Sequence, residues 1–205
     1  MKKLKTMQMK LNNIILLIFV VCIIIFSISC DGGDTIPKPK GYFRIDMPPK
    51  EYVLFDSIYP YTFEYPVYSK IIADNDKNAE PYWINIYYPN FKGTVHLSYK
   101  YVKDNFAKYA EDSYNLAMKH ISKASNIEDN RFDFKENNIH GITFEIDGND
   151  AASPYQFFLT DSISNFVRGA LYFNIKPNND SLSPVINVIK EDIQHIMKTF
   201  KWKKK

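Results

Sequence analysis

The chain has 205 residues, of which 45% are hydrophobic and 16% aromatic, which is enough for a packed domain and excludes a disordered protein. Its two cysteines exclude both a disulfide-stapled scaffold and a cysteine-based zinc module. The net charge is +3, but four lysines lie within residues 1–10, so the chain from residue 30 onward carries −1. Since phosphate binding needs a concentrated basic face, we expect no nucleic-acid partner.

The N-terminus has the features of a secretory signal. A lysine-rich start precedes an apolar stretch, residues 14–28, which is shorter than the roughly 20 residues that a membrane-spanning helix needs. Ser29 and Cys30 follow, and a cysteine after a small residue at this place resembles the processing site of bacterial lipoproteins, although Ser27 stands where that pattern usually has leucine. We therefore expect residues 1–29 to be a lipoprotein signal peptide and Cys30 to carry the lipid. The alternative is an uncleaved signal anchor with an incidental cysteine.

The next segment has the composition of a linker. Residues 31–41 (DGGDTIPKPKG) lack apolar periodicity and are rich in glycine, proline and charge, so we predict a flexible lipidated tether over residues 30–41. Beyond it, aromatic residues continue without a second linker or a repeat, which predicts one domain over residues 42–205. The proline spacing of residues 38–50 favours an extended strand able to pair with the edge of a partner. Packing of this segment on its own domain is the alternative.

The first part of the domain shows the two-residue period of strands. Residues 61–65 alternate until Pro66, and residues 82–88 and 91–102 alternate in the same way. Residues 89–90 (Pro-Asn) between the last two runs predict a tight turn and an antiparallel hairpin.

A helix is predicted next, with Asp104 as its N-cap. Its apolar face is expected to carry Phe106, Ala110, Tyr114, Ala117 and Ile121, which recur every three or four residues. The polar stretch 126–138 that follows predicts at most one weak strand, around Phe132 and Phe134.

Residues 139–147, 155–160 and 165–175 predict three further strands. The chain then predicts a closing helix with Ser183 as N-cap and Pro184 at its first position. Its buried stripe is expected to consist of Ile186, Ile189, Ile193, Ile196, Met197 and Phe200. This order predicts an α+β fold, a mostly antiparallel sheet packed with two amphipathic helices, and it is similar to the order of the Mog1/PsbP-like architecture.

Motifs that carry chemistry are absent from the sequence. The four histidines His96, His120, His140 and His195 lie at least 20 residues apart and form no zinc motif, and there is no nucleophile elbow or phosphate-binding loop. Carboxylate pairs such as Glu191 with Asp192 are expected on exposed helix faces. We therefore predict no catalytic, cofactor-binding or metal-binding residues and no enzyme, although sequence leaves a cluster assembled from distant strands open.

Four long segments resemble the gliding-motility lipoprotein family GldD: residues 37–52 (PKPKGYFRIDMPPKEY), residues 81–100, residues 154–173, and the end from Asn178. The resemblance implies an accessory lipoprotein of gliding motility and the linked type IX secretion machinery. It implies a membrane-anchored position in the cell envelope, facing the periplasm, with other envelope proteins as partners. Cys30 is the one position whose function the resemblance carries over, and the choice between inner and outer membrane stays open.

Two classes of function remain. In the first, the anchored domain assembles or stabilises other proteins of the envelope machinery. In the second, an aromatic pocket between sheet and helix binds a small ligand, a glycan or a lipid fragment, and we would expect Trp83, Tyr87 and Phe158 to line it.

Overall fold

The computed structural model describes residues 13–19, 41 and 45–203. The chain divides into two units, residues 1–41 and 42–205, which we treat separately. In the first unit, residues 13–19 are helical. No helix within the described residues is both long enough and apolar enough to span a membrane.

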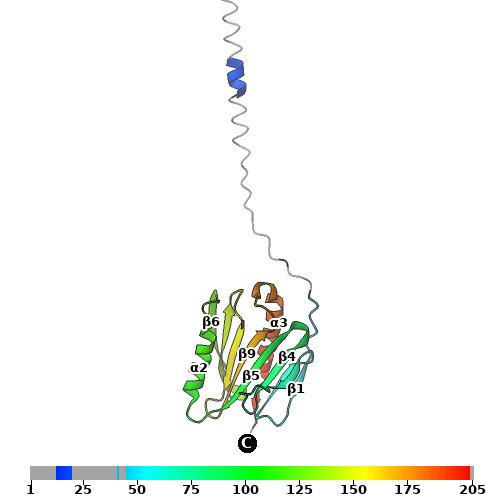
Figure 1. The fold of residues 1–205 in the computed structure, drawn as a ribbon, viewed down its shortest axis with the longest axis vertical. Coiled ribbons are helices and arrows are strands. Elements are labelled where there is room, and N and C mark those ends of the chain that lie inside the picture. Colours follow the sequence, from blue (N-terminus) through cyan, green and yellow to red (C-terminus); the bar gives the residue numbers. More distant parts are fainter. Residues whose placement is uncertain (1–12, 20–40, 42–44, 204–205) are drawn as a thin grey trace, which may run out of the picture. The chain divides into compact units, whose positions relative to one another are not determined.

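A seven-stranded sheet forms the centre of the second unit (Figure 1), and all of its neighbouring strands are antiparallel. In spatial order the strands are β3 (Lys70–Ala73), β4 (Ile84–Tyr88), β5 (Gly93–Tyr101), β9 (Asn165–Phe173), β8 (Tyr155–Thr160), β7 (Ile139–Asp147) and β6 (Asn126–Phe134). The predicted hairpin is β4 and β5, joined by a short 3-10 helix, η1 (Pro89–Phe91). A second, η2 (Lys135–Asn137), joins β6 to β7.

A smaller sheet has three antiparallel strands in the order β1-β2-β10. These are β1 (Tyr52–Phe55), β2 (Tyr61–Pro66) and the two-residue β10 (Lys201–Trp202) at the C-terminal end of the domain. The aromatic rings of Tyr61 and Phe63 are fully buried and stack on Phe200 at centroid distances of 5.3 and 5.8 Å. This aromatic stack joins the small sheet to the C-terminal helix.

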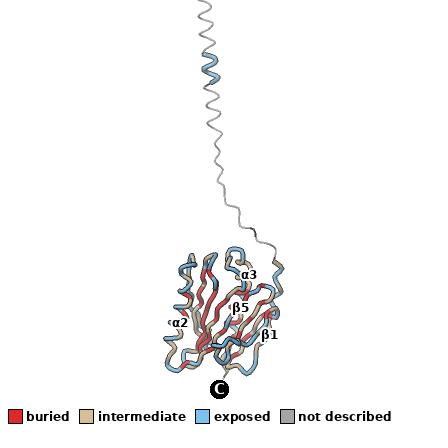
Figure 2. Tube along the Cα trace, viewed as in Figure 1, coloured by how far each residue is buried: buried red, intermediate tan, exposed pale blue. Residues whose placement is uncertain are grey.

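Two helices complete the domain. Helix α3 (Asn179–Thr199) buries Ile189, Ile193 and Ile196 in the main core, together with side chains of β2 and of one face of the large sheet. Helix α2 (Phe106–Met118) packs over β8 and β9 and contributes to a second, smaller apolar cluster. Figure 2 shows the buried residues following the strands of the large sheet, whereas α2 is mostly intermediate or exposed. The predicted α+β class, with a mostly antiparallel sheet and two amphipathic helices, is confirmed.

The helix starts differ from the prediction. The N-cap of α2 is Asn105, because Asp104 has a left-handed backbone with φ of 58°. Tyr114 of the predicted apolar face is 48% exposed, and Ile121 lies beyond the helix and is 68% exposed, so neither is buried. Helix α3 starts at Asn179, because the side chain of Asn178 accepts a hydrogen bond from the backbone N–H of Ser181 and caps the helix earlier than expected.

Several strands also differ from the prediction; β9, for example, ends at Phe173, two residues earlier than predicted. Residues 126–134 form a complete nine-residue edge strand, longer than the weak strand predicted from that polar segment. Strand β4 begins two residues later than the alternation suggests, because Tyr82 has a φ of 69° and cannot continue a strand. Strands β1, β3 and β10 were absent from the prediction.

Candidate functional site

The most unusual buried group is the carboxylate of Asp192 on α3, which is fully buried. The prediction that Glu191 and Asp192 both lie on an exposed face is therefore wrong for Asp192, whereas the Glu191 side chain is 67% exposed. Asp192 lies three residues after Ile189 and four before Ile196, so it belongs to the buried helix face. This helical spacing places position 192 on the buried face, but an acidic residue is usually exposed, so we expected Asp192 on the surface.

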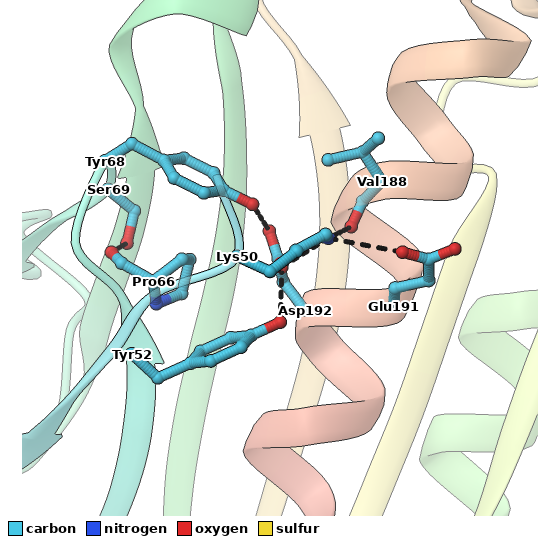
Figure 3. Close-up of polar contacts among 8 residues, drawn as sticks. All are labelled: Lys50, Tyr52, Pro66, Tyr68, Ser69, Val188, Glu191 and Asp192. Carbon is cyan, nitrogen blue, oxygen red and sulfur yellow. Dashed lines mark hydrogen bonds and ion pairs between the residues drawn. The ribbon is translucent and has the colours of Figure 1, made fainter. Parts of the chain in front are cut away.

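Three donors surround this carboxylate (Figure 3). Lys50 Nζ lies 2.7 Å from Asp192 Oδ1, the Tyr52 hydroxyl donates to the same oxygen at 2.9 Å, and the Tyr68 hydroxyl donates to Oδ2 at 2.5 Å. The Lys50 ammonium also donates to the backbone oxygen of Val188 at 2.8 Å. We call Lys50, Tyr52, Tyr68 and Asp192 the N-terminal latch. Because both carboxylate oxygens accept hydrogen bonds, the buried charge is compensated inside the fold.

The latch joins segments that are far apart in sequence. Lys50 lies just before β1, Tyr52 begins β1, and Tyr68 lies in the turn after β2. That turn is fixed by Ser69, whose backbone N–H and hydroxyl both donate to the Pro66 oxygen, at 2.9 and 2.8 Å. The start of the domain is thus tied directly to its last helix.

The electrostatics of the latch favour a structural role. Burial, followed by the hydrogen bond to Asp192, raises the pKa of Tyr52 and of Tyr68 well above the ordinary value. Burial also raises the pKa of the neighbouring Tyr88. The Tyr52 and Tyr68 phenols therefore keep their protons at physiological pH and donate hydrogen bonds to Asp192, a poor starting point for acid–base catalysis.

A second polar contact reinforces the latch. The ring of His195 stacks on Tyr52 at a centroid distance of 3.7 Å, and its Nε2 lies 2.7 Å from Glu64 Oε2. The backbone N–H of Glu64 donates to the hydroxyl of Thr199 at 3.0 Å. Both β1 and β2 are therefore held to α3 by polar contacts in addition to the aromatic core.

The segment at the start of the domain packs on its own domain as far as the structure describes it. Residues 45–50 form no strand, Ile45 packs against the main core, and Lys50 bonds to α3. Residues 38–40 and 42–44 of the segment that we expected to pair with a partner, together with Cys30, lie outside the described residues.

An open cleft of about 580 Å³ lies between α2 and the strands β6, β7 and β8. It is lined by Phe106, Ala110, Arg131, Phe132, Asp133, His140, Gly141, Ile142, Phe158, Thr160 and Ser162. We call it the α2 cleft. Of the three aromatic residues expected to line one pocket, Phe158 lies here, but Trp83 and Tyr87 do not. Trp83 donates from Nε1 to the Tyr99 backbone oxygen at 2.8 Å, and Tyr87 lies on β4, with β5 and β9 between it and the strand of Phe158.

The histidines lie apart from one another, as their sequence spacing suggested. His140 Nδ1 lies 3.0 Å from Asp133 Oδ1, and the His96 ring contacts the edge of Tyr172. Burial, and next the Arg168 charge, lower the pKa of His120. Within the described part of the chain, no three histidine, cysteine or acidic residues gather in a way that could hold a metal ion.

Comparison with known proteins was made at three levels. The solution structure of cyanobacterial PsbP (CyanoP) from Synechocystis sp. PCC 6803 is similar with a TM-score of 0.46 and 11% identity, covering 78% of this chain and 97% of that one. A search of curated proteins gave no match. The family model described as "Gliding motility lipoprotein GldD" matches residues 32–202, nearly everything that follows Cys30. The chain therefore belongs to the family of gliding motility lipoproteins GldD.

Proposed function

We propose that this protein is a lipid-anchored, non-catalytic accessory component of the gliding-motility and linked type IX secretion machinery. In this proposal Cys30 carries acyl chains such as palmitate after removal of the signal peptide, and the domain faces the periplasm. Its work is to assemble or stabilise other envelope proteins. The observation that carries the proposal is the family match over residues 32–202.

The geometry of the latch supports a role as a rigid, anchored body. Lys50 lies between the proposed tether and β1 and is bonded to Asp192 in the last helix. A force on the tether is therefore transmitted to the core through α3. The same contact resists detachment of β1 from the domain. Because the buried carboxylate is already bonded to the domain's own side chains, the latch is better suited to holding the fold together than to reacting with a substrate.

The proposed tether also limits where the domain works. About a dozen extended residues reach at most about 40 Å, so a domain anchored at Cys30 stays beside the membrane. Confinement to one surface raises the effective concentration of partners, and weak contacts then suffice for assembly.

Gene deletion with quantitative proteomics of the envelope tests this proposal. We expect loss of motility together with lower amounts, or wrong location, of other motility and secretion proteins, and recovery of both on complementation with the intact gene. Normal motility, secretion and partner levels in the deletion strain would contradict the accessory role.

A further inference from the structure

The α2 cleft has an apolar floor. Phe106 and Ala110 of α2 face Ile142 of β7 and Phe158 of β8 across it. Its volume of about 580 Å³ lies within the range of small-molecule sites in proteins, about 300–1,000 Å³. The cleft can therefore accommodate an apolar group over this floor.

One charge in the cleft is uncompensated. Asp133 Oδ1 lies 3.0 Å from His140 Nδ1, so each of these two side chains has a polar partner within the wall of the cleft. Arg131, the other charged lining residue, is exposed, and among the described residues its guanidinium has no hydrogen-bond or ion-pair partner. A guanidinium group can donate two parallel hydrogen bonds to a carboxylate or a phosphate, so an arginine beside an apolar floor suits an apolar ligand that carries such an oxyanion.

The Thr160 hydroxyl, which lines the cleft, is not free to bind a sugar. The Thr160 hydroxyl donates to the Asn165 backbone oxygen at 2.8 Å and accepts from the backbone N–H of Ser162 at 2.8 Å. It is therefore already engaged, whereas a glycan needs many free hydrogen-bonding groups around its hydroxyls. Of the two ligands expected from the sequence, the cleft favours the lipid fragment.

We infer that the α2 cleft binds an apolar chain that ends in an oxyanion, with the chain over Ile142 and Phe158 and the oxyanion on Arg131. A carboxylate and a phosphate monoester share this chemistry, so a fatty acid and a phospholipid fragment are its two sources. This inference goes beyond the accessory role, since the cleft involves none of the latch residues and is independent of Cys30.

Photolabelling of the full-length protein in membranes tests the inference. The probe is an alkyl carboxylate with a diazirine in its chain, and the labelled peptides are mapped by mass spectrometry. We expect saturable labelling of the peptides that contain Phe106, Ile142 or Phe158. Octanoate or octyl phosphate should compete for the site, and their relative strength distinguishes the two sources. Octanol, which lacks the charge, should compete equally well only at a concentration at least tenfold higher than that of octanoate or octyl phosphate.

Single substitutions test separately how the Arg131 charge and the apolar floor contribute to ligand binding. Arg131→Gln should remove the preference for octanoate and octyl phosphate over octanol, whereas Arg131→Lys should retain part of it. Lys108→Gln removes one exposed positive charge from α2 outside the cleft and should label like the parent protein. Ile142→Glu should abolish labelling by the anionic probe.

Labelling that does not saturate, that maps outside the cleft, or that octanol and octanoate suppress equally in the parent protein would overturn the inference. Motility and envelope proteomes of the Arg131→Gln strain are measured in parallel. Failure of the ligand experiment with the accessory function intact would then refute the cleft assignment alone.

Discussion

Lys50 Nζ lies 2.7 Å from Asp192 Oδ1, although the two residues are 142 positions apart in sequence. This contact connects the segment just before β1 with the helix that closes the fold. Glu191, beside Asp192, lies 3.4 Å from the same ammonium but is mostly exposed. The two acidic neighbours therefore offer a matched comparison of a buried and a solvated partner.

Removal of the buried Asp192 carboxylate should lower the stability of the fold. Asp192→Ala leaves the Lys50 ammonium and two tyrosine hydroxyls without their acceptor, and we expect a loss of about 3 kcal/mol in the free energy of unfolding. Glu191→Ala should change it by less than about 1 kcal/mol, because exposed ion pairs are screened by water. Equilibrium urea unfolding of the two variants provides the comparison.

A double-mutant cycle tests whether Lys50 and Asp192 act as a unit. Lys50→Met and Asp192→Leu together should cost at least about 1 kcal/mol less than the sum of the single changes, since each single change leaves a partner unpaired. Additive effects would show that the latch is not an energetic unit.

Gly141 on β7 is predicted to be intolerant of a side chain. A Cβ there would lie 2.0 Å from the backbone oxygen of Phe158 and 2.5 Å from the Phe132 ring, so the strand itself would have to move. We expect Gly141→Ala to cost about 3 kcal/mol in the free energy of unfolding. Gly93→Ala is the control, because its Cβ would meet only side-chain atoms, the nearest at 3.1 Å. Equal thermal shifts for the two variants would argue against this packing.

Asp161 should make stability depend on acid pH. Burial alone would raise its pKa, but hydrogen bonds from the backbone N–H groups of Asn165, Ser164 and Ile163 outweigh burial and hold the pKa below 3.8. The unfolded chain then binds the proton first as pH falls. The stabilisation is therefore fully present above the unfolded-state pKa and is lost as pH decreases through the folded-state value.

Asp161→Asn should lower the free energy of unfolding by about 2 kcal/mol at neutral pH. The difference from the parent protein should shrink as pH falls below 3.8. Asp150→Asn, an exposed control, should leave the pH profile unchanged. Urea unfolding at a series of pH values measures all three profiles, and a constant gap between parent and Asp161→Asn would contradict the assignment.

Much of the fold follows from periodicity. The alternation around residues 89–90 predicted the β4–β5 hairpin, and the stripe through Ile189, Ile193 and Ile196 predicted the buried face of α3. These elements are long, and their apolar spacing alone determines which face is buried. The predicted limits of β7 and β8 also agree with the structure.

Tertiary contacts determine the rest. Strands β1 and β3 have four residues each and β10 has two, too few for alternation to stand out from chance. Asp192 looks like a solvated acid until Lys50, Tyr52 and Tyr68 are brought to it from the other end of the domain. The α2 cleft likewise depends on where α2 lies relative to β6, β7 and β8, which no local pattern encodes.

The motility of cells tests whether the domain has to be confined to the membrane through Cys30. Two strains are compared. One carries the intact gene. In the other, the only copy of the protein is an exported domain that lacks Cys30 and has a signal peptide that leads to no lipid attachment. Domain levels are matched by immunoblot, and release from the membrane is verified by fractionation. We expect that cells with the unanchored domain do not glide. Normal gliding of those cells would contradict this expectation.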